Sequence, residues 1–535
     1  MSYPISTSKA QIRELLRSHA PPPEHLPSLI YTLSGELARY DAQILSYEAE
    51  IYCIDELLAC AKAERAELKA HGDDIRSLCA PIRRLPSEIL VEIFELCRFA
   101  FVDATTTDLE DIAMKPLLDL AGVCIRWRDL VLGTPTLWST LHLHAYDIWD
   151  KPTDGPVALQ LLELALERSA NVPLHLQIST FAEEHENTDL PLKLLAHHAE
   201  RWKSVYLFCP ASDLQYLAPV KGRLHRLEQL ELYIVNEPHP LDLFEDVPRL
   251  TSFSLAIPVR PPLVYAYLDK LRMFGCVDEK LGQIPSTVAL MSRLPRGIHF
   301  RFQISLRDTT DDEIRDLTIS STSSDIGRLS MDTTGVADDD YCMHTLSAIF
   351  GALTLPHLTA LTFAAEEYSK CPIPWPHNAF LSLAARSAFP THLQSLDLTY
   401  VVVTEPQLVE ALSALATLQH LAVADHESAD DGGAPLLLVS DSLLAQLTLR
   451  AAPPRRLVPR LRTLTCITTL QFADGVYLAF ARSRGAPPGP GAAPFDIKMY
   501  WAEGHYRALD PGVAACLHEL CVRREVLSHF APYTD

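Results

Sequence analysis

The most regular hydrophobic pattern in the chain lies between residues 33 and 68. Apolar residues recur there at alternating steps of four and three, and Arg65 interrupts them. This spacing keeps an apolar seam on one side of a helix, while Glu, Lys and Arg fill the other sides. It predicts a long helix that ends near Gly72 or Cys79, because Pro81 cannot continue one. The seam consists of Leu33, Leu37, Tyr40, Ile44, Tyr47, Ile51, Ile54, Leu58, Ala61 and Leu68.

Two interpretations of this helix stay open. The first is a coiled coil through which two copies of the chain associate along residues 33–68. The second is a single amphipathic helix that folds back on its own domain. Tyrosines and Arg65 in the seam weaken a strict dimer register, and so the pattern does not choose between them. A shorter helix, from about Ser8 to His19, precedes it and ends before Pro21.

A second helical region extends from residue 81 to about residue 141. Its first helix begins near Pro86, which suits a first turn, and a second amphipathic helix covers Lys115 to Leu132. A polar, acidic insertion from Phe99 to Met114 separates the two, and a short element from Thr134 to Leu141 closes the unit. So small a unit holds more apolar side chains than it can bury, which is typical of a protein interface. The apolar positions are Ile89, Leu90, Ile93, Phe94 and Cys97 on the first helix, and Leu117, Leu120, Val123, Cys124, Trp127 and Leu130 on the second.

From about Leu174 the pattern changes to short alternating runs between polar or proline-bearing stretches. Each run has an apolar residue, two free positions, an apolar residue, one free position and a last apolar residue. That spacing is the core of a leucine-rich repeat, in which the last two apolar side chains share one face of a strand. The runs are Leu227–Leu232, Leu250–Leu255, Leu358–Phe363, Leu393–Leu398, Leu418–Val423, Leu444–Leu449 and Leu461–Cys466, with weaker members at Pro173–Ile178, Trp202–Leu207 and Ile314–Ile319.

A single repeat cannot cover its own apolar face, and so the repeats are expected to stack into an α/β or α+β solenoid. Parallel strands then line a concave wall, and helical returns such as Glu405 to Leu418 form the outside. The repeats are irregular, because most lack the asparagine that normally follows the strand. The gap from Leu255 to Leu358 also holds loops around 258–262 and 338–340. We therefore expect an irregular solenoid rather than a regular horseshoe.

The C-terminal end of the solenoid has its own pattern. Gly485 to Gly491 is rich in glycine and proline and is expected to form a flexible loop. Phe495 to Tyr500 then alternates like a last strand, and Pro511 to Leu527 has the spacing of a helix. That helix is expected to cap the stack.

Length and composition indicate several structural units, and the net charge excludes two classes of partner. The chain has 535 residues, of which 48% are hydrophobic, enough for several structural units. We place them at residues 1–80 for the N-terminal helical region, 81–145 for the small all-α unit and 146–535 for the solenoid with its cap. Lys and Arg number 46 against 68 Asp and Glu, and the resulting net charge of -22 repels phosphate backbones and anionic lipids. Nucleic acid and membrane surfaces are not expected partners.

The N-terminus and the cysteines indicate a location. Met1 to Gln11 has no basic stretch followed by an apolar core, and no later window has about 18 uninterrupted apolar residues. The 12 cysteines are scattered, which favours buried, reduced thiols in a reducing compartment. The nearest cluster, Cys516, His518 and Cys521, points in different directions on a helix and would not gather one ion. We expect a cytoplasmic or nuclear protein, or one found in both, without a metal site.

Catalytic motifs are missing from the sequence. It has no P-loop, no Gly-x-Ser-x-Gly elbow and no His-Glu-x-x-His helix. The neighbouring pair His197 and His198 diverges on a helix and is more simply solvated. We therefore expect a protein that is not an enzyme and that uses no cofactor. A basic group could accept a phosphate, but it is more simply a solvated loop; its members are Arg455, Arg456, Arg460 and Arg462.

The region from Leu85 to Trp138 resembles the F-box. The F-box pattern is matched by Leu85-Pro86, Glu88-Ile89-Leu90, Ile93-Phe94, Val123-Cys124 and Trp127. With the preceding helix and the irregular repeats, the whole chain is similar to the large mushroom-type fungal family of F-box proteins. The resemblance implies an adaptor-binding surface made by Leu85, Pro86, Ile89, Leu90, Ile93, Phe94, Val123, Cys124 and Trp127.

The same resemblance implies a function. The F-box would bind a Skp-family adaptor within an SCF-type cullin-RING ubiquitin ligase, and the repeats would bind an unknown client protein. The chain would then select what becomes ubiquitylated, and the chemistry would occur on other subunits. The alternative is a leucine-rich repeat binding scaffold with no ligase connection, in which the helical pair is internal core.

Overall fold

A computed structural model of the chain provides the fold. It describes residues 9–18, 23–24, 26–100, 115–144, 154–180, 189–235, 242–256, 268–306, 309–334, 339–364, 373–426, 437–449, 457–485, 494–501, 507–523 and 525–532. The chain divides into two compact units, Met1–Leu90 and Val91–Asp535, and each is described by itself. Several predicted features lie mostly outside the described residues: the insertion after Phe99, the loops at 258–262 and 486–491, and Arg455 with Arg456.

The first unit is dominated by one long helix, as the seam predicts. Helix α2 (Leu26–Cys79) has 54 residues, about 80 Å of rise, and none of its residues is buried. It follows the short helix α1 (Lys9–Arg17) and precedes a 3-10 turn, η1 (Pro81–Arg84). Three cysteines of α2 are exposed, which corrects the expectation of buried thiols for Cys53, Cys60 and Cys79.

The predicted second helical region contains more helices than expected. Helix α3 (Ser87–Ala100) begins directly after Pro86. The single helix expected from Lys115 to Leu132 is instead two, α4 (Lys115–Val123) and α5 (Ile125–Gly133). Cys124 is extended between them, with φ -162° and ψ 167°, and the preceding Gly122 is a poor helix former. A 3-10 turn, η3 (Pro135–Trp138), closes the region.

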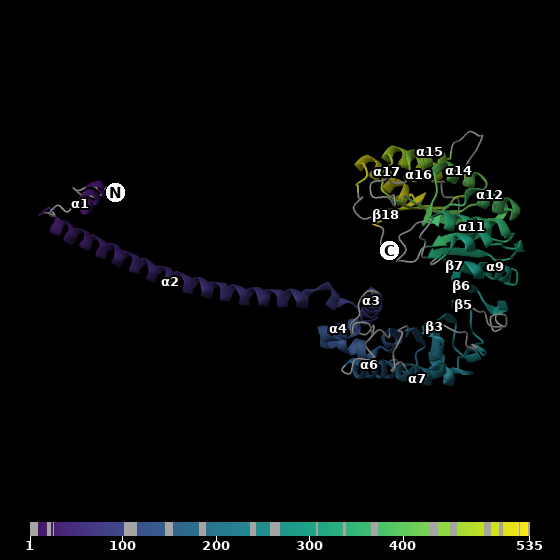
Figure 1. Cartoon of the computed structure of the whole chain (residues 1–535), viewed down its shortest axis with the longest axis horizontal. Coiled ribbons are helices and arrows are strands. Elements are labelled where there is room, and N and C mark those ends of the chain that lie inside the picture. Colours follow the sequence, from purple (N-terminus) through teal and green to yellow (C-terminus); the bar gives the residue numbers. More distant parts are fainter. Residues whose placement is uncertain are drawn as a thin grey trace. The chain divides into compact units, whose positions relative to one another are not determined.

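A parallel sheet of 14 strands runs through the second unit in sequence order. Every neighbouring pair is parallel. Within this unit the strands line the inner side of an arc and the helices lie along its outer side (Figure 1). The strands are β1 (Thr140–His144), β2 (Leu174–Ser179), β3 (Trp202–Pro210), β4 (Gln229–Val235), β5 (Ser252–Ala256), β6 (Met273–Lys280), β7 (His299–Ser305), β9 (Arg328–Thr334), β11 (Ala360–Ala364), β13 (Ser395–Leu398), β15 (His420–Ala424), β16 (Thr463–Thr468), β17 (Phe495–Trp501) and β18 (Val526–Pro532).

Helices and short turns return the chain from one strand to the next. The predicted return from Glu405 is α14, which buries Leu408 and Leu412 and is followed by buried Leu415. The α-helical returns are α6 (Asp154–Arg168), α7 (Asp189–His197), α9 (Ile284–Met291), α10 (Asp311–Asp316), α11 (Asp339–Ala352), α12 (His377–Arg386), α13 (Phe389–His392), α14 (Glu405–Ser413), α15 (Asp441–Leu447), α16 (Asp474–Arg484) and α17 (Pro511–Val522). The 3-10 turns are η4 (Ala199–Arg201), η5 (Ala211–Val220), η6 (Asp242–Phe244), η7 (Leu268–Lys270) and η8 (Leu281–Gln283). Two small pairs, β8 (Thr322–Ser323) with β10 (Leu353–Thr354) and β12 (Ile373–Pro374) with β14 (Val401–Val402), complete the unit.

The structure corrects two of the expected repeats, the interpretation of the gap and the expected capping helix. The run Leu444–Leu449 lies mainly in helix α15, and the run Ile314–Ile319 begins in helix α10 and continues without a strand. The gap from Leu255 to Leu358 contains three strands of the main sheet, β6, β7 and β9. After α17 the chain adds β18 beside β17, so the expected capping helix is not the last element, and Leu527 belongs to a strand.

The core lies between the sheet and the helices. Phe253, Phe274 and Phe300 share one register on β5, β6 and β7, and all three are buried. Their neighbouring ring centroids are 6.0 Å apart in both pairs, a spacing typical of favourable aromatic contacts. Burying each large apolar side chain stabilises the fold by roughly 1.5 to 3 kcal/mol. No helix among the described residues is long and apolar enough to cross a membrane.

Candidate functional site

Helices α3 and α5 pack through an aromatic pair. Phe94 on α3 is completely buried, and its ring centroid lies 4.9 Å from that of Trp127 on α5 at an interplanar angle of 60°. Leu90, one turn earlier on α3, is also completely buried. Phe94 and Trp127 therefore fix the two helices against each other.

Two hydrogen bonds attach turn η3 to the helices. The buried indole Nε1 of Trp138 donates to the carbonyl oxygen of Val131 over 2.7 Å. The hydroxyl of Thr136 donates to a carboxylate oxygen of Glu95 on α3 over 3.1 Å. These bonds connect α3 and α5 through η3, and α4 packs against α5 across the break at Cys124.

Apolar side chains remain exposed beside this packed centre. Val123 and Ile125 flank the break at Cys124 and are 61% and 73% exposed. Leu96 on α3 is 70% exposed and Leu118 on α4 is 42% exposed. Exposed apolar side chains gathered in so short a segment are typical of a docking surface for another protein.

The nine predicted adaptor-binding residues divide into three groups. Leu90 and Phe94 are buried, and Phe94 packs on Trp127. Leu85, Ile93, Cys124 and Trp127 are half-buried. Pro86, Ile89 and Val123 are exposed. Which of them contact an adaptor stays a prediction.

Sequence patterns missed three exposed apolar residues of the second unit. Leu96 falls outside the buried stripe of α3, and Leu118 and Ile125 were hidden in the single helix predicted from Lys115. The sequence signal for the break between α4 and α5 was Gly122, because glycine is common at helix ends.

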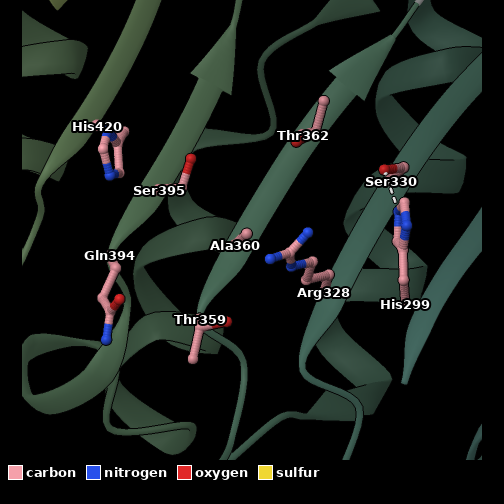
Figure 2. Close-up of a pocket in the computed structure, with 9 residues that line it drawn as sticks. All are labelled: His299, Arg328, Ser330, Thr359, Ala360, Thr362, Gln394, Ser395 and His420. Atoms are coloured by element: carbon pink, nitrogen blue, oxygen red, sulfur yellow. Dashed lines mark hydrogen bonds between the residues drawn. The ribbon is translucent and has the colours of Figure 1, made fainter. Parts of the chain in front are cut away.

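A second feature lies on the strand face that points away from the helices. His299, Arg328, Ala360, Ser395 and His420 occupy one register on five adjacent strands, β7 to β15. They border a cavity of about 380 Å³. In Figure 2 the Arg328 side chain extends toward Ala360, with His299 on one side and His420 on the other. The remaining lining residues are polar or small: Ser330, Thr359, Thr362 and Gln394.

The cavity is lined by nitrogen donors and hydroxyls and has no carboxylate among its lining residues. Nε2 of His299 and Oγ of Ser330 are hydrogen-bonded at 2.8 Å. Burial, and then the guanidinium groups of Arg328 and Arg301, lower the pKa of His299. His299 is therefore neutral near pH 7, and Arg328 carries the permanent charge of the cavity.

The residues considered for metal binding are not brought together. Among the described residues, no three His, Cys, Asp or Glu side chains form a metal-binding group. Cys516 and Cys521 are half-buried on α17. Nδ1 of His197 is hydrogen-bonded to the carbonyl oxygen of Lys193 at 2.7 Å. Burial, followed by the nearby Arg201, lowers the pKa of His198.

Comparisons with known proteins identify one domain. Residues 82–144 match the model of the F-box-like family, and so the chain contains an F-box-like domain there. No curated protein matches the chain. Among solved structures, it is similar to a chain from the crystal structure of the Rad7 and Elc1 complex in yeast, at 15% identity. The alignment covers 55% of this chain and 76% of that one with a TM-score of 0.26, too low to support an argument.

Proposed function

We propose that this chain is the substrate-recognition adaptor of an SCF-type cullin-RING ubiquitin ligase. In this proposal the F-box-like domain binds a Skp-family adaptor, and the solenoid binds a client protein. The observation that carries it is the F-box-like match at residues 82–144, joined to exposed apolar side chains within that same segment. F-box proteins are typically substrate adaptors rather than enzymes, so ubiquitin transfer would occur on other subunits.

The exposed side chains supply apolar surface that a contact would bury. Burying Leu96, Val123 or Ile125 fully would contribute roughly 1.5 to 3 kcal/mol each before the cost of association. Micromolar binding needs about 8 kcal/mol net, so these residues with Ile89 would supply much of the gross energy, and further contacts would offset the cost of association. The surface packed around Phe94 and Trp127 is fixed beforehand, which reduces the entropy lost on docking.

The proposed function is exerted through proximity. A client held on the solenoid would have its lysines at a raised effective concentration near the transferring enzyme. No catalytic group of this chain is needed for that effect.

Co-purification tests the docking surface. The double substitution Val123→Asp and Ile125→Asp places two charges at exposed positions, where the fold tolerates them. The full-length chain is expected to retain a co-expressed Skp-family adaptor, and this double variant is expected to lose it. The matched control is Val157→Asp with Leu190→Asp, on α6 and α7, because these side chains are similarly exposed at 44% and 53%.

The same experiment separates the proposal from its alternative. A binding scaffold without a ligase connection would retain no adaptor in any form of the chain. Adaptor loss from the control variant as well would show that the Val123 and Ile125 surface is not the contact. Circular dichroism of each variant establishes that the sheet is intact.

Three finer assignments belong to the proposal. Membership in the mushroom-type fungal F-box family is supported by the order of long helix, F-box-like domain and solenoid. The repeats are supported as irregular leucine-rich repeats by the buried leucines at their strand positions, such as Leu230 and Leu232 on β4. A cytoplasmic or nuclear location is supported by the buried Cys209 and Cys466, whose pKa values burial raises, which keeps these thiols protonated.

Self-association along residues 33–68 is also proposed. The seam residues Leu37, Ile44, Ile51, Ile54 and Leu58 are each about half exposed or more on α2. A seam with alternating steps of four and three is complementary to a second copy of itself, because both helices then present the same period. A helix folded back on its own domain would bury the seam within one chain, and the mass in solution distinguishes the two.

A further inference from the structure

We propose that the cavity on the strand face binds a single anionic group, a carboxylate or a phosphate, carried by an extended segment of the client protein. The inference rests on the proposed client-binding role and adds the chemistry of the contact. It is carried by Arg328, whose side chain stands in the cavity beside Ala360 (Figure 2).

The charge of Arg328 is unused within the described part of the chain. Arginines on the helix side, such as Arg386, donate to backbone carbonyls. The Arg328 guanidinium, by contrast, makes no hydrogen bond or ion pair with any residue that the structure describes, and it is exposed. A planar guanidinium with free donors matches two oxygens of a carboxylate or phosphate at once.

The other lining groups add donors without adding negative charge. His299 and His420 border the cavity at either end of one register, and hydroxyls of Ser330, Thr362 and Ser395 lie between them or one step further along the strands. Imidazole and hydroxyl groups can each donate a hydrogen bond to an oxyanion, and the bond between His299 and Ser330 uses one donor of that pair. The small side chain of Ala360 leaves the space that the anion would fill.

Acidic residues near the cavity do not neutralise Arg328. Asp397, two residues after Ser395 on β13, accepts hydrogen bonds from the backbone N–H and the hydroxyl of Thr399 at 3.0 and 2.6 Å. Asp332 on β9 is buried and accepts from the Gln303 amide at 3.1 Å. The chain as a whole is negative, with a net charge of -22, but the cavity around Arg328 is locally positive. A locally positive cavity would favour an anionic group from the client.

An extended client segment suits the place of the cavity. The lining residues come from five neighbouring parallel strands or the positions just before them. A client segment that crosses these strands would insert one side chain between Arg328 and His420. The cavity volume of about 380 Å³ accommodates a side chain with a terminal carboxylate or phosphate, and not a folded element.

Arginine-directed labelling tests the site directly. The full-length chain is treated with phenylglyoxal, and the adduct on Arg328 is followed by mass spectrometry. The probes are inorganic phosphate, blocked phosphoserine, blocked glutamate and, as a neutral comparison, blocked serine. We expect saturable protection of Arg328 by at least one anionic probe and none by blocked serine, while the exposed Arg249 on the loop before β5 stays unprotected.

Calorimetry with the probe that protects Arg328 then measures its affinity for the parent chain and for two matched variants. Arg328→Gln is expected to weaken binding roughly tenfold or more, because a charge-assisted pair is lost. Arg249→Gln makes the same change of charge at an exposed position outside the cavity and is expected to leave affinity within about twofold. Protection by phosphoserine alone assigns a phosphate, and protection by glutamate assigns a carboxylate.

Two outcomes overturn the inference: no saturable protection of Arg328 by any anionic probe, or equal weakening by Arg328→Gln and Arg249→Gln. Adaptor co-purification is measured on the same Arg328→Gln chain and is expected to be unchanged. A failed anion site with retained adaptor therefore refutes the inference alone, whereas a failed adaptor interaction refutes the proposed function and leaves the anion measurement standing.

Discussion

Buried arginines join successive repeats through backbone carbonyls. Arg484 on α16 donates to the carbonyl oxygens of Leu447 at 3.0 Å, Val458 at 2.8 Å and Leu457 at 3.1 Å. Arg201 donates to the carbonyl oxygens of Val172 and Leu166 and to the hydroxyl of Ser169. Burial lowers the pKa of Arg484 to about 10, which leaves it charged at neutral pH. These carbonyls end a helix or lie in the loop that follows, so the guanidinium satisfies acceptors that would otherwise be buried without a donor.

Removing the Arg484 guanidinium is therefore expected to destabilise the solenoid. Arg484→Met keeps much of the apolar stem and leaves three carbonyl oxygens without this donor, at a cost of about 2 to 4 kcal/mol. Urea unfolding followed by circular dichroism measures the change. Arg482→Met on the same helix is the control, because Arg482 is exposed, and its midpoint should match that of the parent chain. Equal midpoints for Arg484→Met and the parent would contradict this role.

Asp425 takes the place of the turn asparagine that most repeats lack. Asp425, directly after β15, accepts from the backbone N–H groups of Leu438, Val439 and Thr469 at 2.8 to 2.9 Å. The sequence showed that the usual asparagine was missing. It did not show the substitute, because Leu438 and Thr469 are distant from Asp425 along the chain.

Helix caps explain why two expected repeats are not strands. Ser440 accepts a hydrogen bond from the N–H of Leu443 and begins α15, where the pattern Leu444–Leu449 predicted a strand. Thr310 and Glu313 form a capping box that begins α10 just before the expected run at Ile314. Both caps are visible in the sequence, and each favours helix over the alternating pattern that follows it.

The strands missed in the gap had unequal signals: the runs Leu271–Cys276 at β6 and Ile326–Met331 at β9 have the repeat spacing, and β7 does not. β7 reads His299-Phe-Arg-Phe-Gln-Ile-Ser305, which alternates but lacks the leading leucine of the repeat pattern. β6 contains Gly275, where a side chain would meet the hydroxyl of Ser254 on the neighbouring strand. For β7, alternation alone does not distinguish a strand from a loop, and the stacking of its neighbours decides its pairing.

The apolar seam of helix α2 supports a prediction about self-association. Substituting Ile44→Lys and Ile51→Lys in the apolar seam is expected to convert a dimer into a monomer, because two charges would face each other across the seam. Light scattering after gel filtration measures the mass, which should fall from twice 59.6 kDa to that value.

The control for this prediction uses apolar residues beside the seam. Leu45→Lys and Tyr52→Lys change side chains that are 66% and 67% exposed on another side of α2, and the dimer should persist. A parent chain with a mass of 59.6 kDa at micromolar concentration would show that residues 33–68 do not mediate self-association.

The second unit is a stack in which each strand contacts its neighbours in sequence. Its 14 strands follow one another in order, so the repeat spacing was enough to predict a solenoid with helical returns. The number of repeats was underestimated. The runs Trp138–Leu143, Leu271–Cys276 and Ile326–Met331 have the repeat spacing and lie at β1, β6 and β9, whereas β7 and β18 depart from it.

The sequence predicts where the candidate docking surface lies along the chain, but not which side chains are exposed there. The motif located an F-box from Leu85 to Trp138, within the matched residues 82–144, but a helical pattern cannot tell a side chain that packs inside from one that is exposed. Leu90 and Phe94 are buried, and Val123 and Ile125 are exposed. The cavity at Arg328 was not predictable either, since its lining residues come from five strands spread over residues 299–420.

Hydrogen–deuterium exchange of the full chain, with and without a purified Skp-family adaptor, tests the central claim most directly. The proposed docking surface predicts slower exchange in α3, α4 and α5, with the strongest protection around Val123 and Ile125, and unchanged exchange in β7 to β15. Binding that leaves α3 to α5 unprotected, or no binding at micromolar adaptor, would contradict the assignment.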